Sequence, residues 1–287
     1  MPSLKYYFKK ARKEGFAIGQ FNVSNLETLR AVILAAQNLK SPVIIGTSER
    51  ESQFLGMRQA VSLVKTFRKE TGLPIFLNLD HGRSFRYIKK AIDLGYDTCH
   101  FDGSKLKLRE NIKITKKAVK YARKRDILIE GEVGFVSGSS TLFTKIPKLN
   151  KEDFTDPLKA KNFIRQTQVD RLAVNVGTLH GMSSSGRNPR VNLKLLKAIK
   201  KAVGNFLLVL HGGSVVSEKD IREAIKLGVV KVNVNTELRV AYSNTLRKVL
   251  RGNPKEMVPY KYMPKVIKAI EKVVERKIKL FKSNNKI

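Results

Sequence analysis

The chain has 287 residues, 42% of them apolar, so it is long enough to bury a core and typical of a globular protein rather than a disordered one. No apolar run reaches about 18 residues, the N-terminus lacks the pattern of a secretory signal, and Cys99 is the only cysteine, so we expect no membrane span, no internal disulfide and a cytoplasmic location. Lys and Arg outnumber Asp and Glu by 57 to 24, a net charge of +33, but these residues are spread along helical segments without a focused motif, so no specific nucleic-acid role is expected.

Short β-rich runs alternate with longer amphipathic patterns along the chain. The runs lie at 17–22, 42–48, 74–80, 97–103, 127–133, 170–177, 206–213 and 229–236. The helical patterns lie at 25–39, 51–70, 84–94, 108–125, 157–167, 192–202, 217–227, 237–250 and 263–281. Eight strand–helix repeats predict one (β/α)8 TIM barrel of the α/β class over residues 1–287, with extra C-terminal helices. A doubly wound open sheet is the alternative, but it usually has fewer strands.

Polar residues gather at the carboxyl end of each predicted strand, where they would be costly to bury. They are Asn22, Ser48, Asp80 with His81, Asp102 with Ser104, Glu132, His180, His211 and residues 233–236. In a (β/α)8 barrel these ends converge on one mouth, which is where active sites lie. Serine and asparagine at such positions also serve as helix caps, but histidine is a mediocre cap.

Three of the four histidines, His81, His180 and His211, follow the third, sixth and seventh predicted strands, and each precedes a glycine. Three imidazoles at one rim suit Zn²⁺, with the fourth coordination position open to a substrate. The fourth histidine, His100, lies inside a predicted strand, and we interpret it as a packed core residue, like Cys99 on the opposite face.

Two glycine- or hydroxyl-containing segments, 211-HGGS-214 and 233-NVNT-236, end the seventh and eighth predicted strands. Barrels often bind phosphate at these strands through backbone N–H groups and a Ser or Thr hydroxyl. The pair therefore predicts a ligand that carries phosphate.

Nine motifs in order carry a family resemblance: 19-GQFNVSNLE-27, 41-SPVIIGTSE-49, 78-NLDHGRSF-85, 101-FDGS-104, 130-EGEVG-134, 155-TDPLKAKNF-163, 172-LAVNVGTLHG-181, 208-LVLHGGS-214 and 231-KVNVNTELR-239. With them the chain resembles the class II, zinc-dependent fructose-1,6-bisphosphate aldolases, among the ketose-bisphosphate aldolases. The resemblance implies a carbon–carbon lyase of glycolysis and gluconeogenesis. Such an enzyme reversibly cleaves fructose 1,6-bisphosphate into dihydroxyacetone phosphate and glyceraldehyde 3-phosphate.

The resemblance also implies roles for individual residues. His81, His180 and His211 would hold the catalytic Zn²⁺, Asp102 and Glu132 would line a position for a second divalent or monovalent cation, and Asp80 would be the catalytic acid and base. Residues that would bind the dihydroxyacetone-phosphate half are Gly181, Gly212, Gly213, Ser214, Asn233, Val234, Asn235 and Thr236. Asn22 and Ser48 match further substrate contacts. Arg239 matches a residue that reaches the far phosphate across a dimer interface in some members, which implies a homodimer or homotetramer.

Two segments depart from the family pattern. The loop after the fifth strand has Ser139 and Ser140 where members carry a Glu that handles a proton of dihydroxyacetone phosphate, and Glu152 or Asp153 would replace that Glu only if the loop folds back. Val215 follows Ser214 where members have glycine, which predicts a reshaped phosphate loop.

These departures leave three functions open. An active fructose-bisphosphate aldolase is preferred because the three histidines and Asp80 are all present, and because the tagatose branch tends to carry Lys at the position of Arg239. A tagatose-bisphosphate or related ketose-phosphate aldolase is the alternative within the class. A barrel that binds metal and phosphate without catalysis, and acts as a basic binding protein, is the alternative outside it.

Overall fold

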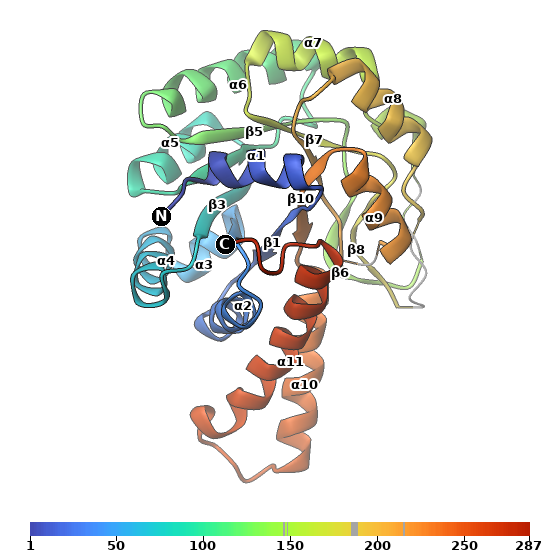
Figure 1. Cartoon of the computed structure of the whole chain (residues 1–287). Coiled ribbons are helices and arrows are strands. Elements are labelled where there is room, and N and C mark those ends of the chain that lie inside the picture. The colour runs from blue at the N-terminus through green and yellow to red at the C-terminus, as the bar shows by residue number, and fades with distance from the viewer. Residues whose placement is uncertain (146, 148, 185–188, 215) are drawn as a thin grey trace.

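The structure, a computed structural model, describes all residues except 146, 148, 185–188 and 215. Eight parallel strands form a closed barrel in the order β1-β10-β9-β7-β5-β4-β3-β2 (Figure 1). They are β1 (Ile18–Asn22), β2 (Val43–Ser48), β3 (Ile75–Gly82), β4 (Thr98–Phe101), β5 (Leu128–Val133), β7 (Arg171–Val174), β9 (Leu208–Leu210) and β10 (Val229–Val234). The predicted (β/α)8 barrel is therefore confirmed. Seven of the predicted runs contain one of these strands, and β3 begins inside the predicted run 74–80 and continues two residues beyond it.

The helices pack around the barrel with their apolar faces inward. They are α2 (Leu26–Asn38), α3 (Glu49–Leu55), α4 (Met57–Thr71), α5 (Phe85–Leu94), α6 (Leu108–Arg123), α7 (Pro157–Thr167), α8 (Leu193–Val203), α9 (Glu218–Lys226), α10 (Thr236–Gly252) and α11 (Pro259–Leu280). The segment predicted as one helix at 51–70 is divided between α3 and α4, because Gly56 has a φ of 87°. The far ends of α10 and α11 form an antiparallel arm that extends away from the barrel (Figure 1). No helix in the described part of the chain could span a membrane.

One helix that the sequence reading did not predict, α1 (Leu4–Glu14), lies across the end of the barrel at which the strands begin (Figure 1). Tyr7 and Phe8 pack there in a separate apolar cluster with first or second residues of barrel strands, such as Ile44 and Phe76. This helix closes the lower end of the barrel, so a substrate can approach only from the opposite mouth.

The segments that follow β5 and β7 each contain a short strand at the mouth. β6 (Gly138–Phe143) and β8 (His180–Ser183) pair in parallel, with Gly138 opposite His180. Gly181 has a φ of 105°, and a Cβ atom there would lie 2.4 Å from the carbonyl oxygen of Ser139. Glycine is thus required at position 181 for β8 to lie against β6.

Charged side chains fill part of the barrel interior. Arg171 Nε and Lys231 Nζ each donate to Glu130 Oε2 at 2.7 Å, and all three side chains are fully buried. The Arg171 guanidinium also donates to Thr98 Oγ1 and lies 5.1 Å from the ring centroid of Phe8 in α1. The two cations offset the cost of burying Glu130, and they join β5, β7, β10 and the closing helix.

Replacement of Arg171 tests this interior layer. Arg171→Met should lower the free energy of unfolding by about 3 kcal/mol, because it removes one of the two cations from a buried carboxylate. Urea denaturation measures the change. Arg222→Met, which removes an exposed pair with Glu218, is the matched control and should cost about 0.5 kcal/mol or less. Equal losses in the two variants would contradict a stabilising role for the interior layer.

Candidate active site

Two adjacent residues at the end of β3, Asp80 and His81, both face the mouth of the barrel. Successive side chains of a regular strand point to opposite faces, so neighbours share a face only where the strand is irregular. The register between β3 and β4 shifts between Leu79 and Gly82, and His81 has a left-handed backbone with a φ of 52°. This bulge re-aims His81 into the site, a strained arrangement that is typical of functional positions.

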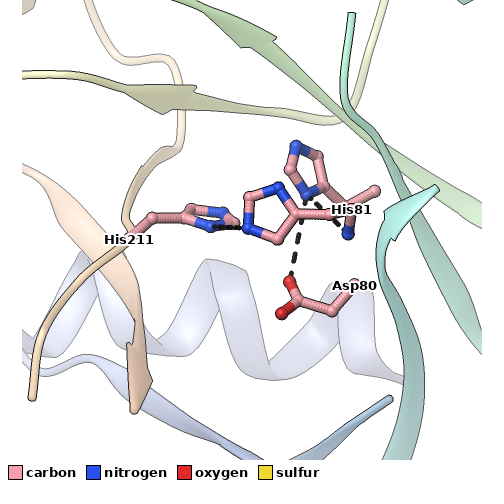
Figure 2. Close-up of side chains that lie close together, drawn as sticks. Asp80, His81 and His211 are labelled. Atoms are coloured by element: carbon pink, nitrogen blue, oxygen red, sulfur yellow. Dashed lines mark hydrogen bonds and ion pairs between the residues drawn. The ribbon is translucent and has the colours of Figure 1, made fainter. Parts of the chain in front are cut away.

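His81 and His211 lie at the centre of the site, and Figure 2 shows their imidazoles pointing toward each other. His81 Nε2 lies 3.1 Å from His211 Nδ1. The other nitrogen of each ring faces a carboxylate: His81 Nδ1 lies 2.8 Å from Asp102 Oδ2, and His211 Nε2 lies 2.8 Å from Glu130 Oε1. Carboxylates behind imidazoles orient histidine ligands in metal sites in this way. Both rings thus direct their free nitrogen toward the same point.

His180, on β8, completes the group of three histidines. Its ring centroid lies 4.9 Å from that of His81 and 6.0 Å from that of His211. Burial lowers the pKa of His180 well below its usual value, and the neighbouring imidazoles lower it further. Burial also lowers the pKa of His211, against the opposing effect of Glu130. Both rings are therefore neutral, which is the form that binds a metal.

His81 and His211 are spaced as two ligands of a small divalent cation would be. Nitrogens bound to tetrahedral Zn²⁺ at about 2.0–2.1 Å lie about 3.3 Å apart, close to the 3.1 Å between His81 Nε2 and His211 Nδ1. Behind them, His81 Nδ1 lies 2.8 Å from Asp102 and 3.9 Å from Glu132, the two carboxylates expected at a second cation position. Glu132 Oε2 is buried and lies 3.0 Å from His100 Nε2, an ion pair without the alignment of a hydrogen bond.

Asp80 is held between two amides beside the histidines. Asn22 Nδ2 donates to Asp80 Oδ2 at 2.9 Å, and Asn233 Nδ2 donates to Asp80 Oδ1 at 3.0 Å. Burial raises the pKa of Asp80, but the nearby imidazoles, first of all His81, outweigh burial and hold it well below its usual value. In turn, burial lowers the pKa of His81, but Asp80 and Asp102 outweigh it and raise that pKa. Asp80 is therefore an ionised carboxylate that is held in a fixed orientation.

A cavity of about 240 Å³ opens above these groups. Of the residues predicted to bind substrate, those that line it are Asn22, Ser48, Gly181, Gly212, Ser214, Asn233, Asn235, Thr236 and Arg239. Two others do not line it: the backbone N–H of Gly213 donates to the carbonyl of Asn233, and the side chain of Val234 is buried in the core. The structure thus brings most of the predicted substrate residues around one hollow.

The segment predicted to hold a phosphate lies at the N-terminus of α10, where backbone N–H groups attract anions. Ser214 Oγ accepts from the N–H groups of Asn235 and Glu237 at 3.3 and 3.4 Å. From α11, Lys277 Nζ donates to the carbonyls of Gly213 and Ser214 at 3.2 and 2.7 Å and fixes the loop from below. Val215, from which a reshaped phosphate loop was predicted, lies outside the described part of the chain.

Arg239 reaches across the rim of the cavity within its own chain. Its guanidinium donates to Glu51 Oε1 at 2.6 Å and to the carbonyl of Ser140 at 3.0 Å. Glu51 Oε2 accepts from Asn22 Nδ2 at 2.9 Å, so one carboxylate connects Arg239 to a partner of Asp80. The rim is therefore a connected polar network.

No carboxylate of the 134–154 segment lines the cavity among its described residues. Ser139, Ser140 and Thr141 line it, as expected for a loop that lost its Glu. Glu152 is exposed, and the Asp153 carboxylate accepts from Asn150 Nδ2, so neither takes the place of the missing Glu. Glu51 is a carboxylate that is hydrogen-bonded to the residues of the rim. Its oxygens, however, already accept from Asn22, Asn235 and Arg239.

Sequence reading missed several residues that support the site. They are His100, Glu130, Glu51, Lys231 and Lys277. His100 was expected to pack in the core, and it is fully buried, but its ring centroid lies 4.7 Å from those of both His81 and His211. Strand alternation could have indicated His100 and Glu130. They stand two residues before Asp102 and Glu132, and residues two apart on a strand lie on the same face.

Contacts of His100 fix its tautomer. The backbone N–H of His81 donates to His100 Nδ1 at 3.2 Å, and His100 Nε2 lies 3.0 Å from Glu132 Oε2. Burial lowers the pKa of His100, whereas Asp80 and Glu132 raise it, to about 10 in sum. A second proton on Nδ1 would repel the N–H of His81, so this contact opposes the raised pKa and favours the ring with a single proton, on Nε2 facing Glu132.

Known proteins resemble this chain in sequence and in fold over nearly its full length. The family model for class-II fructose-bisphosphate aldolase matches residues 2–286. The fructose-bisphosphate aldolase of Staphylococcus aureus (strain Mu50 / ATCC 700699) is 33% identical over 287 residues, which cover 99% of this chain and 98% of the relative. The 6-phospho-5-dehydro-2-deoxy-D-gluconate aldolase of Shouchella clausii (strain KSM-K16) is 35% identical over 280 residues, which cover 96% and 92%.

A solved structure gives the same result. The crystal structure of the YdjI aldolase from Escherichia coli K12 superposes with a TM-score of 0.84 and 31% identity, and the match covers 100% of this chain and 99% of that one. The agreement in sequence and in fold extends over the whole barrel. The chain therefore belongs to the class II fructose-bisphosphate aldolase family.

Proposed function

We propose that the chain is a zinc-dependent fructose-bisphosphate aldolase, which reversibly cleaves fructose 1,6-bisphosphate to dihydroxyacetone phosphate and glyceraldehyde 3-phosphate. The observation that carries the proposal is the convergence of His81, His180 and His211 beside Asp80 at the barrel mouth. Each of these four residues lies in one of the sequence motifs that resemble the family. A cytoplasmic homodimer or homotetramer is part of the same proposal.

The three histidines would hold the Zn²⁺, and the carboxylates of Asp102 and Glu130 would keep two of their rings oriented. Bound there, the metal would supply a Lewis acid that stabilises the negative charge left beside the ketone when the C3–C4 bond breaks. Asp102 and Glu132 would line the second cation position.

Asp80 would carry the proton of the C4 hydroxyl. In cleavage the carboxylate takes this proton as the C3–C4 bond breaks, and in condensation it returns the proton to the same oxygen. The amides of Asn22 and Asn233 hold one carboxylate oxygen each, so the orientation of Asp80 is fixed before substrate binds. Its low pKa keeps it ionised at neutral pH.

Phosphate binding would position the substrate. The N–H groups at the start of α10 and the hydroxyls of Ser214 and Thr236 line the cavity and suit the phosphate of the dihydroxyacetone half. Arg239 would bind the far phosphate. The Glu51 carboxylate must first share or release the Arg239 guanidinium. Positioning by two phosphates fixes the C3–C4 bond relative to Asp80, which lowers the barrier.

A related ketose-phosphate aldolase is the second candidate. The relative with 35% identity is named as acting on 6-phospho-5-dehydro-2-deoxy-D-gluconate, so closely similar chains differ in substrate. Because Glu51 already holds the Arg239 guanidinium at the rim, this contact would lower the affinity for a second phosphate. Tagatose 1,6-bisphosphate is included in this alternative. A basic binding barrel without catalysis is the third.

A coupled cleavage assay tests these alternatives. The Zn²⁺-loaded protein should cleave fructose 1,6-bisphosphate faster than tagatose 1,6-bisphosphate, and a chelator should abolish the activity, because the charge beside the ketone is then unstabilised. The control is His81→Ala, which removes a ligand. Activity that resists the chelator would contradict the metal mechanism, and no activity above the control on either sugar would support the non-catalytic barrel.

Replacement of the proposed base gives a second test. Asp80→Asn should lower kcat by about 10²–10⁴-fold, the usual contribution of a general base, while the protein still binds Zn²⁺ through the three histidines. Steady-state kinetics and metal analysis measure the two effects. Asp93→Asn, on the exposed end of α5, is the control. A kcat within a few-fold of the unmodified protein would remove Asp80 from the mechanism.

A further inference from the structure

Two neighbouring residues at the rim of the cavity, Arg50 and Glu51, have opposite charges and different surroundings. They are the second and third residues of α3, which begins directly after Ser48 at the end of β2. Consecutive residues of a helix point about 100° apart, so the two side chains diverge. Glu51 turns inward and is only 5% exposed, whereas Arg50 is exposed and lines the cavity. The sequence motifs assign neither residue a role.

Both oxygens of the Glu51 carboxylate are occupied by residues of the rim. Oε1 accepts from the Arg239 guanidinium at 2.6 Å and from Asn235 Nδ2 at 3.1 Å. Oε2 accepts from Asn22 Nδ2 at 2.9 Å and from the backbone N–H of Ser48 at 2.8 Å. A ligand that drew Arg239 away would leave this buried carboxylate without its cation, which is costly. Arg239 is therefore bound to the protein before any substrate arrives.

Arg50, in contrast, is free to bind a ligand. Its guanidinium forms no hydrogen bond and no ion pair with any residue in the described part of the chain. Of the described residues that line the cavity, Arg50 and Arg239 are the two that carry a permanent positive charge. An anionic ligand can thus bind Arg50 without breaking a contact within the protein.

The position of Arg50 matches the end of the substrate that lies beyond Asp80. Ser48 is paired in register with Asp80 of β3, and Arg50 follows Ser48 by two residues. The predicted phosphate loop follows β9, which lies opposite β3, four strands away in either direction around the barrel. A ligand that has one phosphate at this loop and its C4 hydroxyl at Asp80 therefore continues toward the start of α3.

We propose that Arg50 is a substrate-binding residue that receives the far phosphate of the ketose bisphosphate, and that it carries a larger share of this binding than Arg239. Glu51 sets the division, because it holds Arg239 in the rim and leaves Arg50 free. A guanidinium suits a phosphate because it can donate two parallel hydrogen bonds to it. The inference rests on the proposed function, since that function defines which end of the substrate lies beyond Asp80.

Binding of two hexitol phosphates to the Zn²⁺-loaded full chain tests the proposal. Glucitol 1,6-bisphosphate and glucitol 1-phosphate lack the ketone of the substrate, so neither can be cleaved, and they differ only in the far phosphate. Isothermal titration calorimetry gives a Kd for each, and the ratio of the two values isolates the contribution of that phosphate. The variants are Arg50→Gln, Arg239→Gln and the matched control Arg58→Gln, which removes an exposed arginine of α4 that does not line the cavity. Glutamine at position 239 still offers Glu51 a hydrogen-bond donor.

In the unmodified protein and in the control, the bisphosphate should bind at least about tenfold more tightly than the monophosphate, as charge-assisted hydrogen bonds would give. Arg50→Gln should bring the two Kd values within about threefold of each other and change the Kd of glucitol 1-phosphate by less than about threefold, because only the far phosphate loses its partner. Arg239→Gln should keep a ratio of about five or more, because Glu51 already holds that guanidinium.

The inference is overturned if Arg50→Gln keeps the ratio of the unmodified protein, or if Arg239→Gln lowers the ratio as far as Arg50→Gln does. Equal Kd values for the two hexitols in the unmodified protein would overturn it as well. In each of these cases, cleavage of fructose 1,6-bisphosphate in the coupled assay would still support the proposed function. Conversely, the expected Kd values in a protein that cleaves neither sugar would support the role of Arg50 while the proposed function fails.

Discussion

Glu130 connects the interior of the barrel to the site at its mouth. One carboxylate oxygen accepts from Arg171 and Lys231, and the other faces His211 Nε2. Because the two cations neutralise the buried carboxylate, it can lie behind an imidazole at full burial without a prohibitive desolvation cost. The orientation of His211 then follows, since the nitrogen that faces Glu130 leaves the other nitrogen to face His81. Stability and site geometry thus depend on the same charge cluster.

The second constraint is local and lies in β3. A regular strand would direct only one of Asp80 and His81 to the mouth, whereas the proposed reaction needs a carboxylate beside a metal ligand. The bulge and the positive φ of His81 direct both inward. Tertiary contacts hold this strained backbone in place, among them the hydrogen bond to His100 Nδ1 and the pair with Asp102. At the rim, in contrast, Glu51 holds Arg239, the residue proposed to bind the far phosphate.

Much of the barrel follows from hydrophobic periodicity, because strands buried on both faces and amphipathic helices have distinct patterns. All eight barrel strands and most helices were predicted this way. The strand-end rule also placed His81, His180 and His211 at one mouth, and the structure brings them together. Helix α1 was not predicted, although its Leu4, Tyr7, Phe8 and Ala11 are buried, because what that face packs against becomes visible only in the folded barrel. Strands β6 and β8 were missed because their pairing depends on contacts between distant loops, such as Gly181 against Ser139.

The supporting residues were harder to predict, for a physical reason. His100, Glu130 and Lys231 act through partners on other strands, and a single strand pattern shows that they point inward but not what they meet. The same applies to Lys277, which reaches the phosphate loop from a helix more than 60 positions away in the chain. A polar residue on the inward face of a strand therefore indicates that a buried partner exists, but the sequence does not identify that partner.

The proposed function requires that these constraints converge on one metal between His81 and His211. Crystals of the protein grown with Zn²⁺ and measured at the zinc absorption edge test it directly. An anomalous peak should lie within about 2.0–2.3 Å of both His81 Nε2 and His211 Nδ1. A peak that contacts neither nitrogen, or no peak inside the barrel, would contradict it.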